Sequence, residues 1–172
     1  MYSIVHNVQL ITGVTNLSSD FKCFSDPNLL EKGGLFHVSS PRGGSTRFAL
    51  SCLNLFLETV DPPLSPCRAH YLWIADEGFL YPVALPFHCR TPVSRWLLVK
   101  ARDPTETWKI ALEAIQTGLF GFVFLRPSRS CDATHLRRLQ LSSERTQTRI
   151  FLLGNLRFPH WVIKHSFEVI NP

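Results

Sequence analysis

The sequence lacks the features that would place it among secreted, membrane-spanning or zinc-binding proteins. It has no run of 18 apolar residues, and its first residues, MYSIVHNVQLITG, have neither the cationic start nor the continuous apolar run of a signal peptide. The five cysteines form no C-x-x-C pair, and no Cys or His pair has a spacing typical of zinc ligands. We therefore expect a cytoplasmic protein with reduced thiols, no bound metal and no membrane partner.

Motifs of common enzymes are also missing. There is no G-x-S-x-G elbow, the seven histidines are scattered, and the one pair of carboxylates that stands out is Asp76 and Glu77. The nearest approach to a nucleotide-binding motif is FHVSSPRGGSTRFAL, residues 36–50, in which a short apolar strand leads into a Gly-rich turn and a helix start. The frame G-x-x-x-x-G-K-[ST] places Ser45 at the lysine position. The cation of a working phosphate loop is therefore absent.

Length and composition favour one packed domain. The chain has 172 residues, of which 45% are hydrophobic and 18% charged, including 13 Phe and 4 Trp. We assign residues 31–172 to the core domain and residues 1–30 to an N-terminal segment. This segment could add a strand to a partner through its apolar residues, which are Ile4, Val8, Leu10 and Ile11.

Apolar runs of strand length alternate with segments of helical period, the pattern of an α/β protein with a mainly parallel sheet. The predicted strands cover residues 35–39, 70–75, 96–100, 119–125 and 149–153. The predicted helices cover residues 45–59, 103–118 and 132–146. In residues 160–170, alternating apolar side chains predict an antiparallel strand or hairpin that completes the sheet, with one side formed by Trp161, Ile163, Phe167 and Val169.

The positive charge is concentrated in the second half of the chain. Residues 1–89 carry 5 Lys and Arg against 7 Asp and Glu, whereas residues 90–172 carry 13 against 6. Six arginines fall within 24 positions, namely Arg126, Arg129, Arg137, Arg138, Arg145 and Arg149. Such a cluster suits DNA phosphates or an acidic protein face, and a solvated basic surface is the plain alternative. No aromatic residues interleave with these arginines to stack bases, which favours a protein partner at least as much as DNA.

Residues from about 32 to 155 resemble a RecA-type ATPase core. KGGLFHVSSPRGGST is similar to the strand and turn that carry the phosphate loop, and LWIADEGFLYP is similar to the second core strand with its acidic turn. WLLVKARDPTETWKIALEAIQTG together with LRRLQLSSE most resembles the ImuA and SulA group of the bacterial DNA-damage response. The resemblance implies a three-layer RecA-like P-loop fold, with a mainly parallel central sheet, helices on both faces and antiparallel C-terminal strands.

The resemblance also assigns roles that can be compared with the residues present. Glu77 matches the water-activating glutamate, and the position of the metal-holding aspartate falls near Arg126. With Ser45 for lysine and an arginine for the aspartate, the electrostatic parts of phosphoryl transfer are missing, so we expect no ATP hydrolysis and no cofactor. The degenerate phosphate loop comprises Ser39, Ser40, Pro41, Arg42, Gly43, Gly44, Ser45 and Thr46.

Two states of that loop remain open. Its glycine-rich amides at a helix start could still hold an anion with help from Arg42 or Arg47. Alternatively, the hydroxyls of Ser39, Ser40 and Ser45 satisfy these amides, and the loop is an inert turn.

As a member of this group, the chain would be a non-catalytic adaptor that links RecA to a translesion polymerase subunit. The alternatives are an inhibitor that binds a cell-division protein, as SulA does, or a weak nucleotide-binding protein.

Overall fold

The computed structural model describes residues 4–9, 30, 32–40, 44–59, 70–78, 80, 82, 85, 89 and 91–170. Its strands are β1 (Ile4–Gln9), β2 (Gly34–Ser39), β3 (His70–Ala75), β4 (Trp96–Lys100), β5 (Phe120–Arg126), β6 (Arg149–Leu153) and β7 (His165–Ile170). Its helices are α1 (Ser45–Thr59), α3 (Pro104–Thr117) and α4 (Ala133–Thr146), with a 3-10 turn, η5 (Val93–Arg95), before β4. The predicted order of strands and helices between residues 35 and 153 is confirmed.

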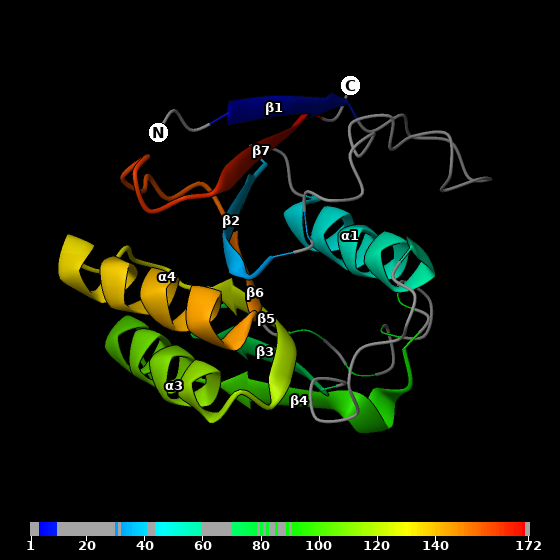
Figure 1. The fold of residues 1–172 in the computed structure, drawn as a ribbon, viewed down its shortest axis with the longest axis horizontal. Helices are drawn as coiled ribbons and strands as arrows, with labels where there is room; N and C mark the ends of the chain where they lie inside the picture. Colours follow the sequence, from blue (N-terminus) through cyan, green and yellow to red (C-terminus); the bar gives the residue numbers. More distant parts are fainter. Residues whose placement is uncertain are drawn as a thin grey trace.

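All seven strands belong to one sheet, in the order β1-β7-β2-β6-β5-β3-β4, and every neighbouring pair is parallel (Figure 1). The C-terminal strand is present, but its predicted antiparallel direction is wrong, since β7 runs parallel to both β2 and β1. The segment between β6 and β7 crosses back to the amino-terminal edge of the sheet before β7 begins. Trp161 lies in this crossover and is 55% exposed, whereas Phe167 and Val169 on β7 are buried as predicted.

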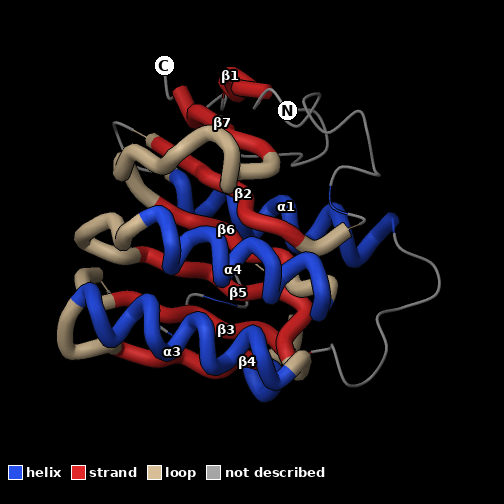
Figure 2. Tube along the Cα trace, turned by 60° about the vertical axis from the view of Figure 1, so that its left-hand side comes forward, coloured by secondary structure: helices blue, strands red, loops and turns tan. Residues whose placement is uncertain are grey.

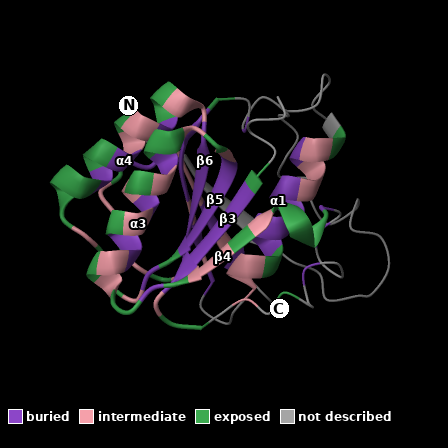
Figure 3. Ribbon diagram, turned by 90° about the horizontal axis from the view of Figure 1, so that it is seen from below, coloured by how far each residue is buried: buried purple, intermediate pink, exposed green. Residues whose placement is uncertain are grey.

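The molecule has three layers, with α1 on one face of the sheet and α3 and α4 on the other (Figure 2). Phe36 and Phe151 belong to the cluster on the α1 face, and Leu35 and Ile150 to the cluster on the α3 and α4 face. The strands between the helices are almost wholly buried (Figure 3). This arrangement explains why β3, β5 and β6 are apolar on both faces, as expected for parallel strands covered on both sides.

The two outer helices begin and end where their capping residues predict. Asp103 caps α3 by accepting the Glu106 amide, and Gly118 ends the helix in the left-handed region. Asp132 caps α4 by accepting the amide of His135, and hydrogen bonds from that residue lower the pKa of the Asp132 carboxyl. The buried residues of α4 are Leu136, Leu139 and Ser143, at the spacing of one helix face.

Part of the N-terminal segment is built into the sheet. Residues 4–9 form the edge strand β1, which pairs with β7 from the other end of the chain. The strand therefore joins this chain's own sheet, and pairing of its outer edge with a partner stays a prediction. Leu10 and Ile11 lie outside the described residues.

Candidate functional site

The degenerate phosphate loop connects β2 to α1, as predicted. Ser39 is the last residue of β2 and Ser45 is the first residue of α1, with Thr46 after it. Gly44 has φ of 102°, a conformation that other residues rarely adopt, which explains the glycine before the helix. Residues 41–43 of the loop, which include Arg42 and Gly43, lie outside the described residues. The strand and the helix that flank a phosphate loop are thus present without its lysine.

One loop amide is satisfied by the next crossover of the fold. The backbone N–H of Ser40 donates to Oδ1 of Asn155, 2.9 Å away, in the segment after β6. The Ser39 hydroxyl donates to the Phe167 carbonyl at 3.4 Å, away from the loop amides. The sequence suggested that serines would occupy these amides, but for Ser40 the partner is Asn155. An amide already paired with a side chain is less available to an anion.

Asp76, the first residue of the acidic turn after β3, has a structural role. Asp76 accepts the backbone N–H of Ser128 at 2.9 Å and its hydroxyl at 2.7 Å, so it ties the segment after β5 to the end of β3. Glu77, the residue matched to a water-activating glutamate, is exposed beside it. The carboxylate that makes contacts here is therefore Asp76, which sequence reasoning did not assign to the site.

A guanidinium lies close to this turn. Arg126 ends β5, pairs in register with Ala75 of β3, and is exposed. Its side chain lies over Gly78, since a Cβ added at that glycine would meet the Arg126 guanidinium carbon at 3.4 Å. Because β6 lies between β2 and β5, one strand separates the phosphate-loop strand from Arg126. A positive charge next to Glu77 would repel a metal ion bound there.

The exposed side of α4 carries the predicted basic surface. Arg137, Arg138 and Arg145 are exposed, and Leu141 between them is 49% exposed. Arg137 donates to Gln140, whereas Arg138 and Arg145 make no hydrogen bond or ion pair with any described residue. Their guanidinium groups are thus available to a partner. We call Arg137, Arg138, Leu141 and Arg145 the basic face of α4.

Arg126 and Arg129 are also exposed, but they precede the helix at the carboxyl edge of the sheet. At 1.5 Å per residue, the 14 residues of α4 span about 21 Å. The exposed arginines therefore follow the helix from end to end and do not form one compact cluster.

Arg149 does not belong to this surface, which corrects the sequence-based prediction. It is 5% exposed, and its side chain donates to the carbonyls of Leu30 and Gln147. Its guanidinium carbon lies 4.1 Å from the centre of the Phe56 ring and 5.4 Å from that of Phe122. Proximity along the sequence grouped it with the exposed arginines, but its position as the first residue of β6 directs it inward.

Comparison with known proteins identifies a structural neighbour. The chain is similar to SulA from Pseudomonas aeruginosa, with 19% sequence identity and a TM-score of 0.47. The match covers 71% of this chain and 98% of that structure. No protein-family profile matches the sequence, and no curated protein matches it either.

The described cysteines are poor candidates for chemistry. Burial raises the pKa of the Cys52 and Cys89 thiols, and burial followed by the nearby Asp132 charge raises that of Cys131 to about 12. Such thiols are protonated at neutral pH and weakly nucleophilic. Among the described residues, no three His, Cys, Asp or Glu side chains are grouped as metal ligands would be, and no helix is long and apolar enough to cross a membrane.

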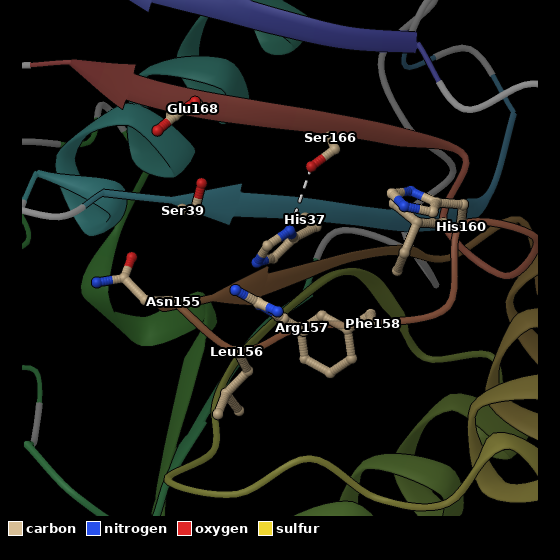
Figure 4. Close-up of a pocket in the computed structure, with 10 residues that line it drawn as sticks. His37, Ser39, Asn155, Leu156, Arg157, Phe158, His160, Ser166 and Glu168 are labelled. Atoms are coloured by element: carbon tan, nitrogen blue, oxygen red, sulfur yellow. Dashed lines mark hydrogen bonds between the residues drawn. The ribbon is translucent and has the colours of Figure 1, made fainter.

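Sequence reasoning missed a polar pocket between β2, β7 and the crossover that joins β6 to β7 (Figure 4). Its volume is about 530 Å³. Its lining residues are His37, Ser39, Asn155, Leu156, Arg157, Phe158, His160, Ile163, Ser166 and Glu168. Ser39 is the one residue shared with the degenerate phosphate loop. The available signal was the alternation of polar residues on two strands, at positions 37 and 39 and again at 166 and 168.

Proposed function

We propose that this protein is a non-catalytic, RecA-like adaptor of the bacterial DNA-damage response, acting in the cytoplasm. In this role it joins RecA to a translesion polymerase subunit. The observation that carries the proposal is the charge at the carboxyl edge of the sheet. Ser45 begins α1 and Arg126 ends β5, at the positions where the RecA resemblance calls for a lysine and an aspartate. A site without these two charges favours binding over phosphoryl transfer.

The basic face of α4 is the proposed contact surface. Arg138 and Arg145 have no partner among the described residues, and a half-exposed Leu141 lies between them. Arginine is enriched at the energetic centres of protein interfaces, and its fork pairs with carboxylates in two parallel hydrogen bonds. These features support an acidic protein partner and leave DNA as a second ligand for the exposed arginines.

The test is capture of the named partners by a tagged protein in bacteria treated with a DNA-damaging agent. The variant Arg138→Glu/Arg145→Glu reverses the two free charges of the basic face. The matched control Lys100→Glu/Lys109→Glu makes the same change in net charge at exposed lysines on β4 and α3. We expect the wild type and the control to capture RecA or a polymerase subunit. The α4 variant should capture at least about tenfold less of the same partner. Equal retention by both variants would show that α4 is not the contact surface.

The same cells distinguish the adaptor from its closest alternative. An inhibitor of a cell-division protein causes filamentous cells when it is overproduced, whereas the adaptor raises the frequency of damage-induced mutation. Filamentous cells with an unchanged mutation frequency would contradict the adaptor function and favour the division inhibitor. DNA binding is measured separately with single- and double-stranded oligonucleotides at two salt concentrations.

A nucleotide-dependent activity makes a different prediction. It requires that purified protein binds ATP at millimolar concentration and that Thr46→Ala weakens this binding. We expect neither ATP turnover nor a Thr46-dependent change, because no lysine is present to neutralise the phosphates.

A further inference from the structure

One side of the pocket is formed by β2 and β7, which carry polar residues that are unusual for strands inside a parallel sheet. Parallel strands covered on both faces are normally apolar throughout, and the buried stretches of β3, β5 and, after Arg149, β6 follow this rule. On β2 and β7, however, the face toward α1 is apolar except for the ring of His165, which stacks on Phe36. The other face has four polar side chains in two register pairs, His37 with Ser166 and Ser39 with Glu168. These four residues form the polar floor of the pocket.

The crossover from β6 to β7 forms the opposite wall and is fixed to β2. The Gly154 N–H donates to the Val38 carbonyl at 3.0 Å, and the Lys164 N–H donates to the Leu35 carbonyl at 2.8 Å. Between these anchors, Asn155 accepts the Ser40 amide. The wall is therefore held at both ends without a ligand, as a preorganised binding site requires.

The hydrogen bonds of His37 fix the tautomer of its neutral ring. Nε2 lies 2.9 Å from the Gly154 carbonyl, which can only accept, so this nitrogen carries the proton. Nδ1 lies 3.2 Å from the Ser166 hydroxyl and accepts its hydrogen in the neutral ring. Burial lowers the pKa of His37, which keeps the imidazole neutral near pH 7. Both ring nitrogens are thus occupied.

The floor offers hydrogen-bond acceptors to a ligand. Ser166 donates its hydrogen to His37 and Ser39 donates its own to the Phe167 carbonyl, so both oxygens present lone pairs. Glu168 adds a carboxylate that has no hydrogen bond or ion pair with any described residue. A ligand on this floor must supply donors, such as hydroxyl or ammonium groups.

The wall offers donors. Arg157 and His160 line the pocket and make no hydrogen bond or ion pair within the described part of the chain. Oδ1 of Asn155 is occupied by the Ser40 amide, which leaves the donor side of that carboxamide for a ligand. A guanidinium and an amide on one wall suit an acid group, either a carboxylate or a phosphate.

We propose that this pocket binds a small molecule with an acid group at one end and hydroxyl or ammonium groups at the other. The acid group lies on Arg157, and the donors lie on Glu168, Ser39 and Ser166. A volume of about 530 Å³ is in the range of small-molecule sites, and the mixed lining excludes a purely apolar ligand. This site is separate from the basic face of α4 and uses none of its arginines.

The experiment is a titration of the protein with a fixed set of probes. Binding is measured by calorimetry and by the NMR signals of the histidine rings. Ribose 5-phosphate and gluconate carry both kinds of group, as phosphate and as carboxylate. Serine also carries both kinds of group, with an ammonium group among its donors. Inorganic phosphate and glucose each carry only one kind. We expect at least one two-ended probe to bind about tenfold more tightly than either single-ended probe, and to shift the His37 ring signals. The identity of the two-ended probe that binds shows whether the pocket prefers a carboxylate or a phosphate as the acid group.

Two variants locate the ligand. Arg157→Ala and Glu168→Gln are each expected to weaken binding at least about tenfold, because each removes one end of the recognition. Arg129→Ala removes an exposed arginine outside the pocket and is the matched control, with unchanged affinity expected. Thermal unfolding of each variant verifies the fold. The proposal is overturned if no probe binds at about 10 mM, or if Arg157→Ala and Arg129→Ala bind alike. Neither result affects partner capture through α4.

Discussion

Replacement of Arg149 tests whether a buried charge holds Leu30, at the end of the N-terminal segment, to the sheet. Its guanidinium group donates to the Leu30 carbonyl and lies 4.1 Å from the centre of the Phe56 ring. Loss of a desolvated cation–π contact costs about 2 kcal/mol, and each buried carbonyl left without a donor costs about 1–3 kcal/mol. Because some of this loss is recovered by water and relaxation, we expect Arg149→Ala to lower the free energy of unfolding by about 3–5 kcal/mol.

Urea unfolding followed by tryptophan fluorescence measures this change as a shift of the midpoint at constant slope. Arg149→Met keeps the packing between the rings and removes only the charge and hydrogen bonds, so its loss should be smaller, about 1–3 kcal/mol. Arg145→Ala, an exposed arginine of the last turn of α4, is the control and should change stability by less than about 0.5 kcal/mol. If Arg149→Ala also stays within about 1 kcal/mol of wild type, the guanidinium does not stabilise this part of the core.

Three further predictions concern other parts of the sheet. Asp76→Ala should lower the unfolding free energy by about 1–3 kcal/mol and speed hydrogen exchange of the Ser128 amide, while Glu77→Ala should do neither. Gly33→Ala should cost about 3 kcal/mol or more in the same urea assay, because its Cβ would lie 2.3 Å from a backbone oxygen of α4. His37 has a lowered pKa, so below pH 6.5 the unfolded chain binds its proton more readily and stability falls as the pH falls. His37→Gln should reduce the stability difference between pH 7.5 and pH 5.5, and an unchanged difference would contradict this.

The elements that could be predicted are those whose signals are local. Residues 103–118 were predicted as a helix, and its ends lie at the caps Asp103 and Gly118, because capping depends on a few neighbouring residues. The apolar runs of β3 and β5 marked buried parallel strands for the same reason. The direction of β7 could not be predicted in this way, since alternation along a strand shows which face is buried and carries no information about the direction of its neighbours.

The candidate site depends more on distant contacts. The strand and turn of the phosphate loop were predicted, but the partner of Ser40 is Asn155, which is 115 residues away in sequence. The burial of Arg149 depends on Phe56 and Phe122, from two other elements of the core. The cluster of six arginines in the sequence was therefore predicted to be one exposed surface, although five of them are exposed and Arg149 is buried.

The order of the strands has a consequence for synthesis on the ribosome. β2 emerges early, yet both of its neighbours, β6 and β7, are made after more than a hundred further residues. During translation the apolar side chains of β2 and α1 have no sheet to join, so they need a chaperone or remain exposed to aggregation until β6 and β7 have been made. A premature stop before β6 would leave β2 with no neighbouring strand, and we expect such products to be degraded and not to accumulate as a smaller folded domain.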